Sequence, residues 1–312
     1  IHLDEMPTEI VGKGSKPKHP GSKVVYSEYT DDEAEEKLEE LRQKIYKKLA
    51  MLHEQGTIGL QENLDAVNAG GKDGTVARTY AVNPEWVHTH NFKGPEGEEK
   101  QHVAEPNWRF MQEFARSPGC VTLWCRGPIG DATFIDMTPA GKGKSAAEIH
   151  DLRATRVAGI KELQLGTRYG LPMNNDGHID PKGLARFPSM VVNVFLNASY
   201  NEQGERLLDR LEKKVIKAGH PDLKEHFESF DHDLDAFGQS LSMINTPDAP
   251  VWVIPADNKK QASLAHAQLI NGLLKLIDPS EPTSNPDVSV AERQHYIQLL
   301  QRELAAEKKH KA

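Results

Sequence analysis

The sequence predicts an α/β fold built on a mostly parallel, doubly wound sheet. Three apolar runs, at 121–125, 190–196 and 251–254, are short and almost continuous, as in strands that are buried on both faces. Longer stretches with helical spacing separate these runs. Because alternating strands and helices imply right-handed crossovers, we expect helices on both faces of the sheet and ligands at the carboxyl ends of the strands.

The chain is predicted to consist of an N-terminal arm, one large domain and a C-terminal tail. Residues 1–30 are rich in Lys, Pro and Gly, which predicts an irregular basic arm. Residues 31–278 carry the predicted strands and have the length of one large α/β domain. Residues 279–312 begin as a linker and continue as an amphipathic helix from Val288 to about Lys308. Its apolar stripe consists of Leu299, Leu300 and Leu304. This stripe favours docking on this domain or on a second subunit over membrane binding, and we expect a homo-oligomer.

A long polar insertion at about residues 137–188 lies between two of the predicted strands. It carries six basic side chains, which are Lys142, Lys144, Arg153, Arg156, Lys161 and Arg168. One interpretation is a helical lid that folds over a bound anion. The other is a helical excursion whose charges contact only water.

The stretch from Ala66 to Thr75 is the main functional signal. Glycines around a lysine, placed between a strand and a helix, are typical of loops that bind phosphate through backbone N–H groups and a mobile charge. The usual motif has Gly in the place of Ala66 and Ser or Thr in the place of Asp73. The preceding strand presents a conflict, because residues 61–63 are polar where a central strand should be apolar.

Composition limits the class of protein. A net charge of −8 over 312 residues argues against a general nucleic-acid-binding surface. The two cysteines, Cys120 and Cys125, lie in a predicted buried strand region, which argues against a disulfide framework or a thiolate metal site. No run reaches the roughly 20 apolar residues that span a bilayer, and residues 1–30 lack the apolar centre of a secretory signal. We therefore expect a cytoplasmic protein that binds neither nucleic acid nor membrane.

The octet from Asn68 to Thr75 resembles the loop of one known family. It differs at a single position from the Asp-Ala-Gly-Gly-Lys-Asp-Gly-Thr loop of the polyphosphate kinase 2 family. Further segments resemble that family in the same order over roughly residues 38 to 278. They are Val82-Asn83-Pro84, Trp108-Arg109, Phe195-Leu196-Asn197, Glu202-Gln203 with Arg206 and Arg210, and Trp252-Val253-Ile254-Pro255-Ala256-Asp257. The resemblance implies a three-layer kinase fold of the P-loop NTPase type with a helical lid. It also implies phosphoryl transfer with Mg²⁺ between inorganic polyphosphate and ADP or AMP, or the reverse reaction from ATP.

The resemblance also implies roles for individual residues of the loop. Lys72 matches the lysine that binds the transferred phosphate, and Asn68 stands where the family has an aspartate that helps to hold metal or to position the acceptor. The remaining loop residues expected to bind phosphate are Gly70, Gly71, Asp73, Gly74 and Thr75. An amide has no negative charge to offer to Mg²⁺, so a catalytic Asn68 departs from the family pattern.

A second family motif, Phe-Asp/Asn-Arg-Ser-x-Tyr-Glu-Asp, aligns with Trp124 to Asp131. Arg126 matches an essential arginine and Asp131 the final acid. The other motif residues are replaced by Cys125, Gly127, Ile129 and Gly130. A thiol is a poor ligand for Mg²⁺, so Asp131 is the expected metal ligand, with Asp73 as the other candidate.

Downstream, Arg206 and Arg210 lie one helical turn apart and match arginines that grip polyphosphate and nucleotide. A surface ion pair with Glu202 or Glu205 would explain the same spacing. Lys259 and Lys260 follow the last strand and could contact phosphate or base.

Three functions remain open at this point. The first is a polyphosphate-dependent nucleotide phosphotransferase. The second is a homologue that binds polyphosphate or nucleotide and has lost catalysis, because Asn68 and Cys125 replace acids expected near Mg²⁺. The third is a P-loop kinase for another small phosphoryl acceptor.

Overall fold

The computed structural model describes residues 23–24, 29–80, 83–92, 107–114, 118–213, 223–280, 294–299 and 301. The chain forms two compact units, Ile1–Pro279 and Ser280–Ala312. In the second unit, residues 294–299 are helical and Leu299 is exposed. Most of the predicted basic arm, and Leu300 and Leu304 of the predicted tail helix, lie outside the described residues. Among the helices that the structure describes, none is long and apolar enough to cross a membrane.

The first unit is built on a six-stranded sheet whose described strand pairs are all parallel. The strand order is β1-β6-β5-β2-β4-β3. The strands are β1 (Lys23–Val24), β2 (Gly59–Ala66), β3 (Val87–Asn91), β4 (Val121–Cys125), β5 (Ser189–Asn197) and β6 (Val251–Pro255). The predicted α/β fold with a parallel sheet is thus confirmed, and the polar strand β2 lies at its centre between β5 and β4.

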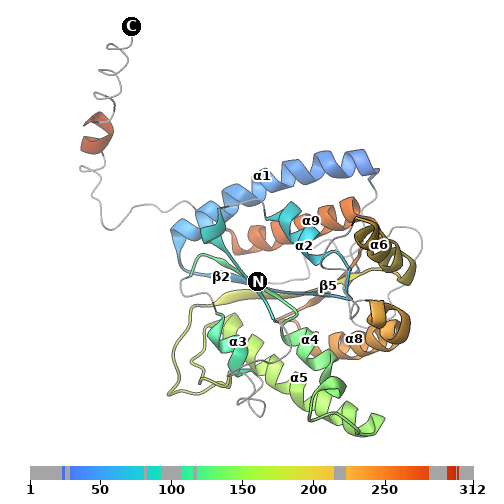
Figure 1. Cartoon of the computed structure of the whole chain (residues 1–312). Helices are drawn as coiled ribbons and strands as arrows, with labels where there is room; N and C mark the ends of the chain where they lie inside the picture. Colours follow the sequence, from blue (N-terminus) through green and yellow to red (C-terminus); the bar gives the residue numbers. More distant parts are fainter. Residues whose placement is uncertain are drawn as a thin grey trace. The chain divides into compact units, whose positions relative to one another are not determined.

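Helices cover both faces of the sheet (Figure 1). One face carries α1 (Asp31–Gln55), α2 (Lys72–Thr79) and α9 (Lys259–Ile277). The other face carries α3 (Trp108–Gln112), α4 (Pro128–Thr133), α5 (Ala146–Tyr169) and α8 (Phe230–Ile244). Helix α6 (Tyr200–Glu212) follows β5, and a π-helical turn, η5 (Glu225–Ser229), precedes α8. The short 3-10 turns are η2 (Pro84–Trp86) and η4 (Ile135–Met137).

The polar residues of β2 are buried because each finds a partner. On the face toward α5, the Gln61 amide donates to Asn63 Oδ1 at 3.1 Å, and the Asn63 amide donates to Asn193 Oδ1 at 2.9 Å. Gln164 of α5 donates to the same Asn193 oxygen at 2.8 Å. The conflict seen in the sequence is therefore resolved by side-chain pairing across β2, β5 and α5, since buried polar groups are tolerated when they are hydrogen-bonded.

The opposite face of β2 buries a carboxylate in a second network. Glu62 accepts a hydrogen bond of 2.6 Å from the Tyr80 hydroxyl, and its other oxygen lies 2.6 Å from His266 Nε2. Thr79 Oγ1 lies 2.8 Å from the second ring nitrogen of His266. Burial, together with the Glu62 carboxylate, raises the pKa of Tyr80 well above its ordinary value. This network joins β2 to the end of α2 and to the middle of α9.

The insertion at 137–188 contains α5, whose apolar face packs against β5 and α8. Arg153 and Arg156 of this helix are buried. The Arg153 guanidinium donates to the carbonyls of Ala132 and Thr133 at 3.1 and 3.2 Å, so this arginine supports the end of α4. The remaining basic residues of the insertion are exposed or half-buried. The closing of this segment as a lid stays a prediction.

Candidate functional site

The loop between β2 and α2 has the backbone of a tight phosphate-binding turn. Gly71 caps α2 with φ of 99°, and Ala69 also has a positive φ of 55°. A Cβ at Gly70 would lie 2.6 Å from the Ala66 Cβ and 2.8 Å from the Val67 carbonyl oxygen. The two glycines are therefore needed for the turn itself, and the turn brings the N–H groups at the start of α2 to the carboxyl end of the sheet.

Lys72 is the first residue of α2 and is half-buried. Its ammonium donates a hydrogen bond of 2.9 Å to the carbonyl oxygen of Ala66, so the side chain folds back over the loop. A lysine in this position carries its charge to the same place as the loop N–H groups.

Asn68 and Arg126, two of the residues predicted to be catalytic, are in direct contact. The Arg126 guanidinium donates to Asn68 Oδ1, and Arg126 itself has a φ of 55° at the end of β4. Gln203 of α6 donates from its side-chain amide to the Asn68 carbonyl at 2.8 Å. His226 of η5 in turn lies 2.5 Å from Gln203 Oε1. Both the side chain and the backbone of Asn68 are thus fixed.

Arg206 is buried beneath the loop. It forms an ion pair of 2.6 Å with Glu202, donates to the Ala69 carbonyl at 3.0 Å and also donates to the Ala256 carbonyl. The ion pair that the sequence offered as an alternative therefore exists, and it orients the guanidinium toward the loop. Arg206 ties the phosphate loop to the turn after β6.

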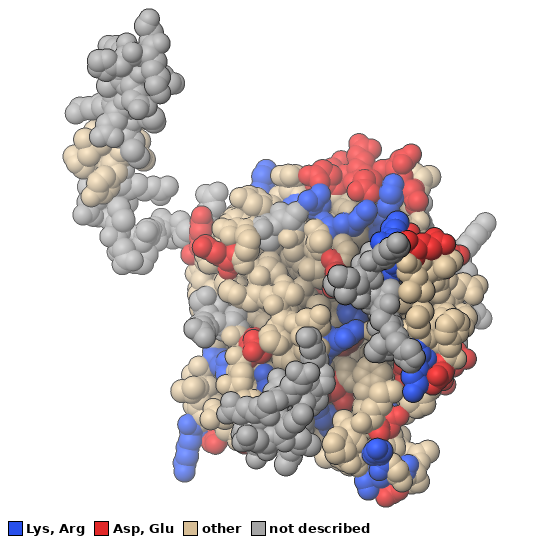
Figure 2. Space-filling model, viewed as in Figure 1, with Lys and Arg blue, Asp and Glu red and all other residues tan. Residues whose placement is uncertain are grey.

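A pocket of about 210 Å³ opens beside the loop, between α2, α6 and the start of α9. It is lined by Gly70, Gly71, Gly74, Thr75, Arg78, Arg206, Asp209, Arg210, Ala256, Lys259, Ala262 and Ser263. The structure thus brings together the predicted glycines, Thr75 and both predicted arginines. Figure 2 shows basic side chains lying among acidic ones over α1 and α2. The cations that line the pocket can nevertheless bind a polyanion although the whole chain is acidic.

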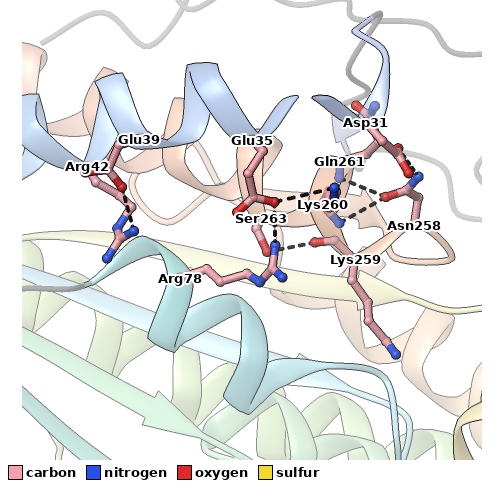
Figure 3. A network of polar contacts seen from close by, with 10 residues as sticks. All are labelled: Asp31, Glu35, Glu39, Arg42, Arg78, Asn258, Lys259, Lys260, Gln261 and Ser263. Atoms are coloured by element: carbon pink, nitrogen blue, oxygen red, sulfur yellow. Dashed lines mark hydrogen bonds and ion pairs between the residues drawn. The ribbon is translucent and has the colours of Figure 1, made fainter. Parts of the chain in front are cut away.

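Arg78 and Lys259 are two further cations of this pocket, and they differ in their contacts (Figure 3). Arg78 of α2 forms an ion pair of 3.2 Å with Glu35 of α1, and Lys260 lies 3.9 Å from the same Glu35 carboxylate. The side chain of Lys259 extends away from this network. The structure therefore separates the two lysines: Lys259 lines the pocket, whereas Lys260 pairs with α1. Sequence reasoning missed Arg78, although it follows Gly74 and Thr75 at helical spacing.

The carboxylates expected to serve a metal are placed differently. Asp131 lies 2.8 Å from Arg156 and 3.9 Å from Arg109, so its charge is shared between two buried guanidinium groups. Asp73 is exposed on α2. Burial, with the nearby Glu62 carboxylate, raises the pKa of Cys125 to about 12, so the thiol is protonated at neutral pH.

The structure adds one carboxylate that sequence reasoning missed. Asp65 is buried near the end of β2, and its Oδ2 accepts a hydrogen bond of 3.1 Å from the backbone N–H of Gly130. Burial raises the pKa of Asp65 to about 6, while the positive charges of Lys72 and Arg126 act in the opposite direction. The signal that could have identified it is an acid at the carboxyl end of a central strand.

A magnesium ion fits this donor set only in part. Within the described residues, no group of three or more His, Cys, Asp or Glu side chains is placed to hold a metal. Mg²⁺ usually needs just one or two carboxylates, because substrate phosphates and waters complete its shell. A single carboxylate beside the loop is therefore compatible with Mg²⁺ that arrives with a phosphorylated substrate.

Comparison with known proteins gives the family. A family model described as polyphosphate kinase 2 matches residues 180–282, which include α6, β6 and α9. Over 239 residues the chain is 26% identical to an ADP-polyphosphate phosphotransferase of Rhodopseudomonas palustris, with 76% of each chain covered. These matches support the polyphosphate kinase 2 family for this chain.

Other members extend the likeness over most of the chain. An AMP/ADP-polyphosphate phosphotransferase of Meiothermus ruber is 25% identical over 225 residues, which is 71% of this chain and 74% of that protein. The crystal structure of polyphosphate kinase 2 from Arthrobacter aurescens TC1 has the same fold, with a TM-score of 0.71 and 24% identity over 92% of this chain and 94% of the other. The predicted family and its P-loop NTPase-like fold are thus confirmed. The site residues are predictions that these likenesses leave open.

Proposed function

We propose that this protein transfers a phosphoryl group between inorganic polyphosphate and ADP or AMP, with ATP or ADP as the nucleotide product. The observation that carries the proposal is the pocket beside the loop. There the glycines of the loop, Thr75, Arg206 and Arg210 meet two further cations, Arg78 and Lys259. A chain of phosphates is the ligand class that such a row of cations recognises.

The contacts of each residue suggest its role in the transfer. Lys72 reaches back over the loop and neutralises the phosphoryl group in transfer. Arg126, held by Asn68, adds a second positive charge at the end of β4. Arg206 fixes the loop from below, whereas Arg210 lines the open pocket and contacts substrate. Bound Mg²⁺ would neutralise charge on the phosphate oxygens. Asp131 and Asp73 are the candidate ligands of this ion.

A binding protein without catalysis is the second candidate. Two observations favour it: the Asn68 side chain accepts a hydrogen bond from Arg126 where the family has an acid, and the Cys125 thiol is protonated at neutral pH. This protein would keep the cationic pocket and bind polyphosphate without transfer. A cytoplasmic location and a homo-oligomeric state also belong to the proposal, and light scattering on the purified chain checks the latter.

The experiment compares the full chain with Lys72→Ala and with a matched control, Lys275→Ala, which removes an exposed lysine of α9. Each variant is incubated with long-chain polyphosphate, Mg²⁺ and either ADP or AMP, and the ATP or ADP formed is measured. Turnover that is lost in Lys72→Ala and kept in Lys275→Ala supports the phosphotransferase. Absence of turnover in the wild type, with polyphosphate binding retained, overturns it in favour of the binding protein. Gain of turnover in Asn68→Asp would then identify the lost group.

A further inference from the structure

Ala69 of the phosphate loop has a backbone conformation that residues other than glycine rarely adopt. Its φ is 55°. Such a conformation costs free energy and persists only where neighbouring groups hold it in place. Side chains of α6 hold the carbonyls on both sides of it: Gln203 donates to the Asn68 carbonyl at 2.8 Å, and Arg206 donates to the Ala69 carbonyl at 3.0 Å. Since a peptide unit is planar, these two bonds fix the peptide planes before and after Ala69.

The Gln203 amide is itself oriented by a buried histidine. A backbone carbonyl can only accept a hydrogen bond, so Gln203 turns its nitrogen toward Asn68 and its oxygen, Oε1, toward His226 Nδ1 at 2.5 Å. His226 therefore carries a proton on Nδ1 and donates it to Gln203. Gln203 has no exposed surface and His226 is 5% exposed, so bulk water does not compete for these bonds.

The fold makes room for this imidazole on α6. His226 lies in the π-helical turn η5, and π-helical turns are frequent at functional sites. Gly204 lets α6 approach the ring, because a Cβ at this position would lie 3.1 Å from His226 Nε2. Tyr200 stacks on the ring, with centroids 4.1 Å apart and an interplanar angle of 15°. A glycine inside a helix lowers helix stability, so the space that it leaves for His226 compensates for a local cost.

We propose that His226 is a positioning residue of the phosphate site: it orients Gln203, and Gln203 in turn fixes the Asn68 carbonyl and the strained turn at Ala69. The inference rests on the proposed function for the ligand, a chain of phosphates. Neither His226 nor Gln203 is among the described residues that line the pocket, so both act through the backbone of the loop. The Asn68 side chain also accepts a hydrogen bond from Arg126, so the same relay supports an arginine assigned to the transferred phosphate.

The test measures phosphate binding separately from turnover. Tripolyphosphate is the probe, and its affinity for the full chain is measured by isothermal titration calorimetry at pH 8. Burial lowers the pKa of His226, so the ring is neutral at this pH. The variant His226→Phe keeps an aromatic ring beside Tyr200 and removes the donor. We expect the affinity to fall about tenfold, because one buried hydrogen bond that holds the binding conformation is lost.

A conservative variant and a control complete this comparison. In His226→Asn, the amide nitrogen is as many bonds from Cβ as Nδ1 is, so it can donate to Gln203 and should recover most of the lost affinity. The matched control is His88→Phe, an exposed histidine of β3, which should bind tripolyphosphate as the wild type does. Unchanged affinity in His226→Phe, or an affinity in His226→Asn as low as in His226→Phe, overturns the proposal.

A double variant separates the relay from a local packing effect. Gln203→Met removes both hydrogen bonds of the relay and should weaken tripolyphosphate binding at least as much as His226→Phe does. Adding His226→Phe to Gln203→Met should then cause no further loss, because both substitutions act through the same bond to Asn68. Losses that add up would mean that His226 acts independently of Gln203, and would contradict the proposal.

The wild-type chain provides a measurement that needs no substitution to fold. Nitrogen NMR shifts of the imidazole report which ring nitrogen carries the proton, and the relay requires a protonated Nδ1 in His226 at pH 8. A bare Nδ1 overturns the proposal. Failure of the proposed function looks different, because a chain without turnover can still bind tripolyphosphate in a way that depends on His226. A phosphotransferase whose binding is indifferent to His226→Phe refutes this inference alone.

Discussion

Removing the charge of Asp65 should stabilise the protein at neutral pH when no divalent cation is present. The carboxylate is 2% exposed and near the end of a central strand, so its ionised form pays a desolvation penalty in the folded state. Asparagine has nearly the same shape and can keep the hydrogen bond from Gly130. The substitution Asp65→Asn therefore removes the buried charge and little else.

The magnitude follows from the pKa. Burial raises the pKa of Asp65 from 3.8 to about 6, and each unit corresponds to about 1.4 kcal/mol, which gives about 3 kcal/mol. Because the folded pKa lies above the unfolded one, the folded state binds the proton more tightly. The stability that this proton contributes is fully present below pH 3.8 and is lost as the pH rises through 6. Relative to wild type, Asp65→Asn should gain about 3 kcal/mol between pH 4 and pH 8.

Urea denaturation of both proteins, at several pH values from 4 to 8 with a chelator present, measures this difference directly. Other titrating groups are common to both proteins and cancel in the comparison. A difference that does not change with pH, or a variant that becomes less stable than wild type as the pH rises, would refute the reasoning.

Four further substitutions test other contacts of the site and of the network on β2. Lys72→Ala should lower kcat by about 10²–10³-fold. The unfolding midpoint should not change, since the side chain is half-buried and donates a hydrogen bond to a loop carbonyl. A large fall in stability would instead show that Lys72 supports the fold. Arg206→Ala should lower the unfolding free energy by about 3–5 kcal/mol, because it leaves its buried hydrogen-bond partners unsatisfied. Arg210→Ala should leave the unfolding free energy unchanged and raise the half-saturating polyphosphate concentration several-fold, because this arginine lines the open pocket. Equal effects of the two variants in both assays would contradict this difference in roles. Tyr80→Phe should cost about 2 kcal/mol in urea denaturation, since Glu62 loses a hydrogen bond inside the protein, and a neutral result would mean that the network rearranges.

The fold could be predicted wherever a strand is apolar. Strands β4, β5 and β6 are almost continuous apolar runs, and the structure buries all of their residues except Asn197 and Pro255, which are half-buried. Strand β2 could not be predicted with the same rules, because its polar residues Gln61 to Asn63 depend on partners far along the chain. Asn193 is 130 residues from Asn63, and His266 is 204 residues from Glu62. A local pattern carries no information on such pairs, although they decide whether a polar strand can be buried.

The phosphate loop of the site could be predicted from the sequence more readily than its carboxylates. The glycines and Lys72 are neighbours in the chain, so their spacing alone predicts a turn that holds phosphate. Arg78 and Asp65 acquire their roles from elements that are distant in sequence, namely Glu35 of α1 and Gly130 of α4. Their positions follow from the order of strands and the packing of helices, which a motif does not contain.

Both faces of β2 lead to the phosphate loop, and this arrangement explains why a central strand keeps buried acids. Glu62 connects the strand to the end of α2 through Tyr80, while Asp65 connects it to α4 through Gly130. The loop begins one residue after Asp65, so a change in either carboxylate acts on the backbone that holds phosphate. Apolar residues would fill the same volume without the desolvation penalty, so stability alone gives no reason to bury an acid at residue 65. The charges of Lys72 and Arg126 offset part of that penalty, because they favour the ionised form of Asp65.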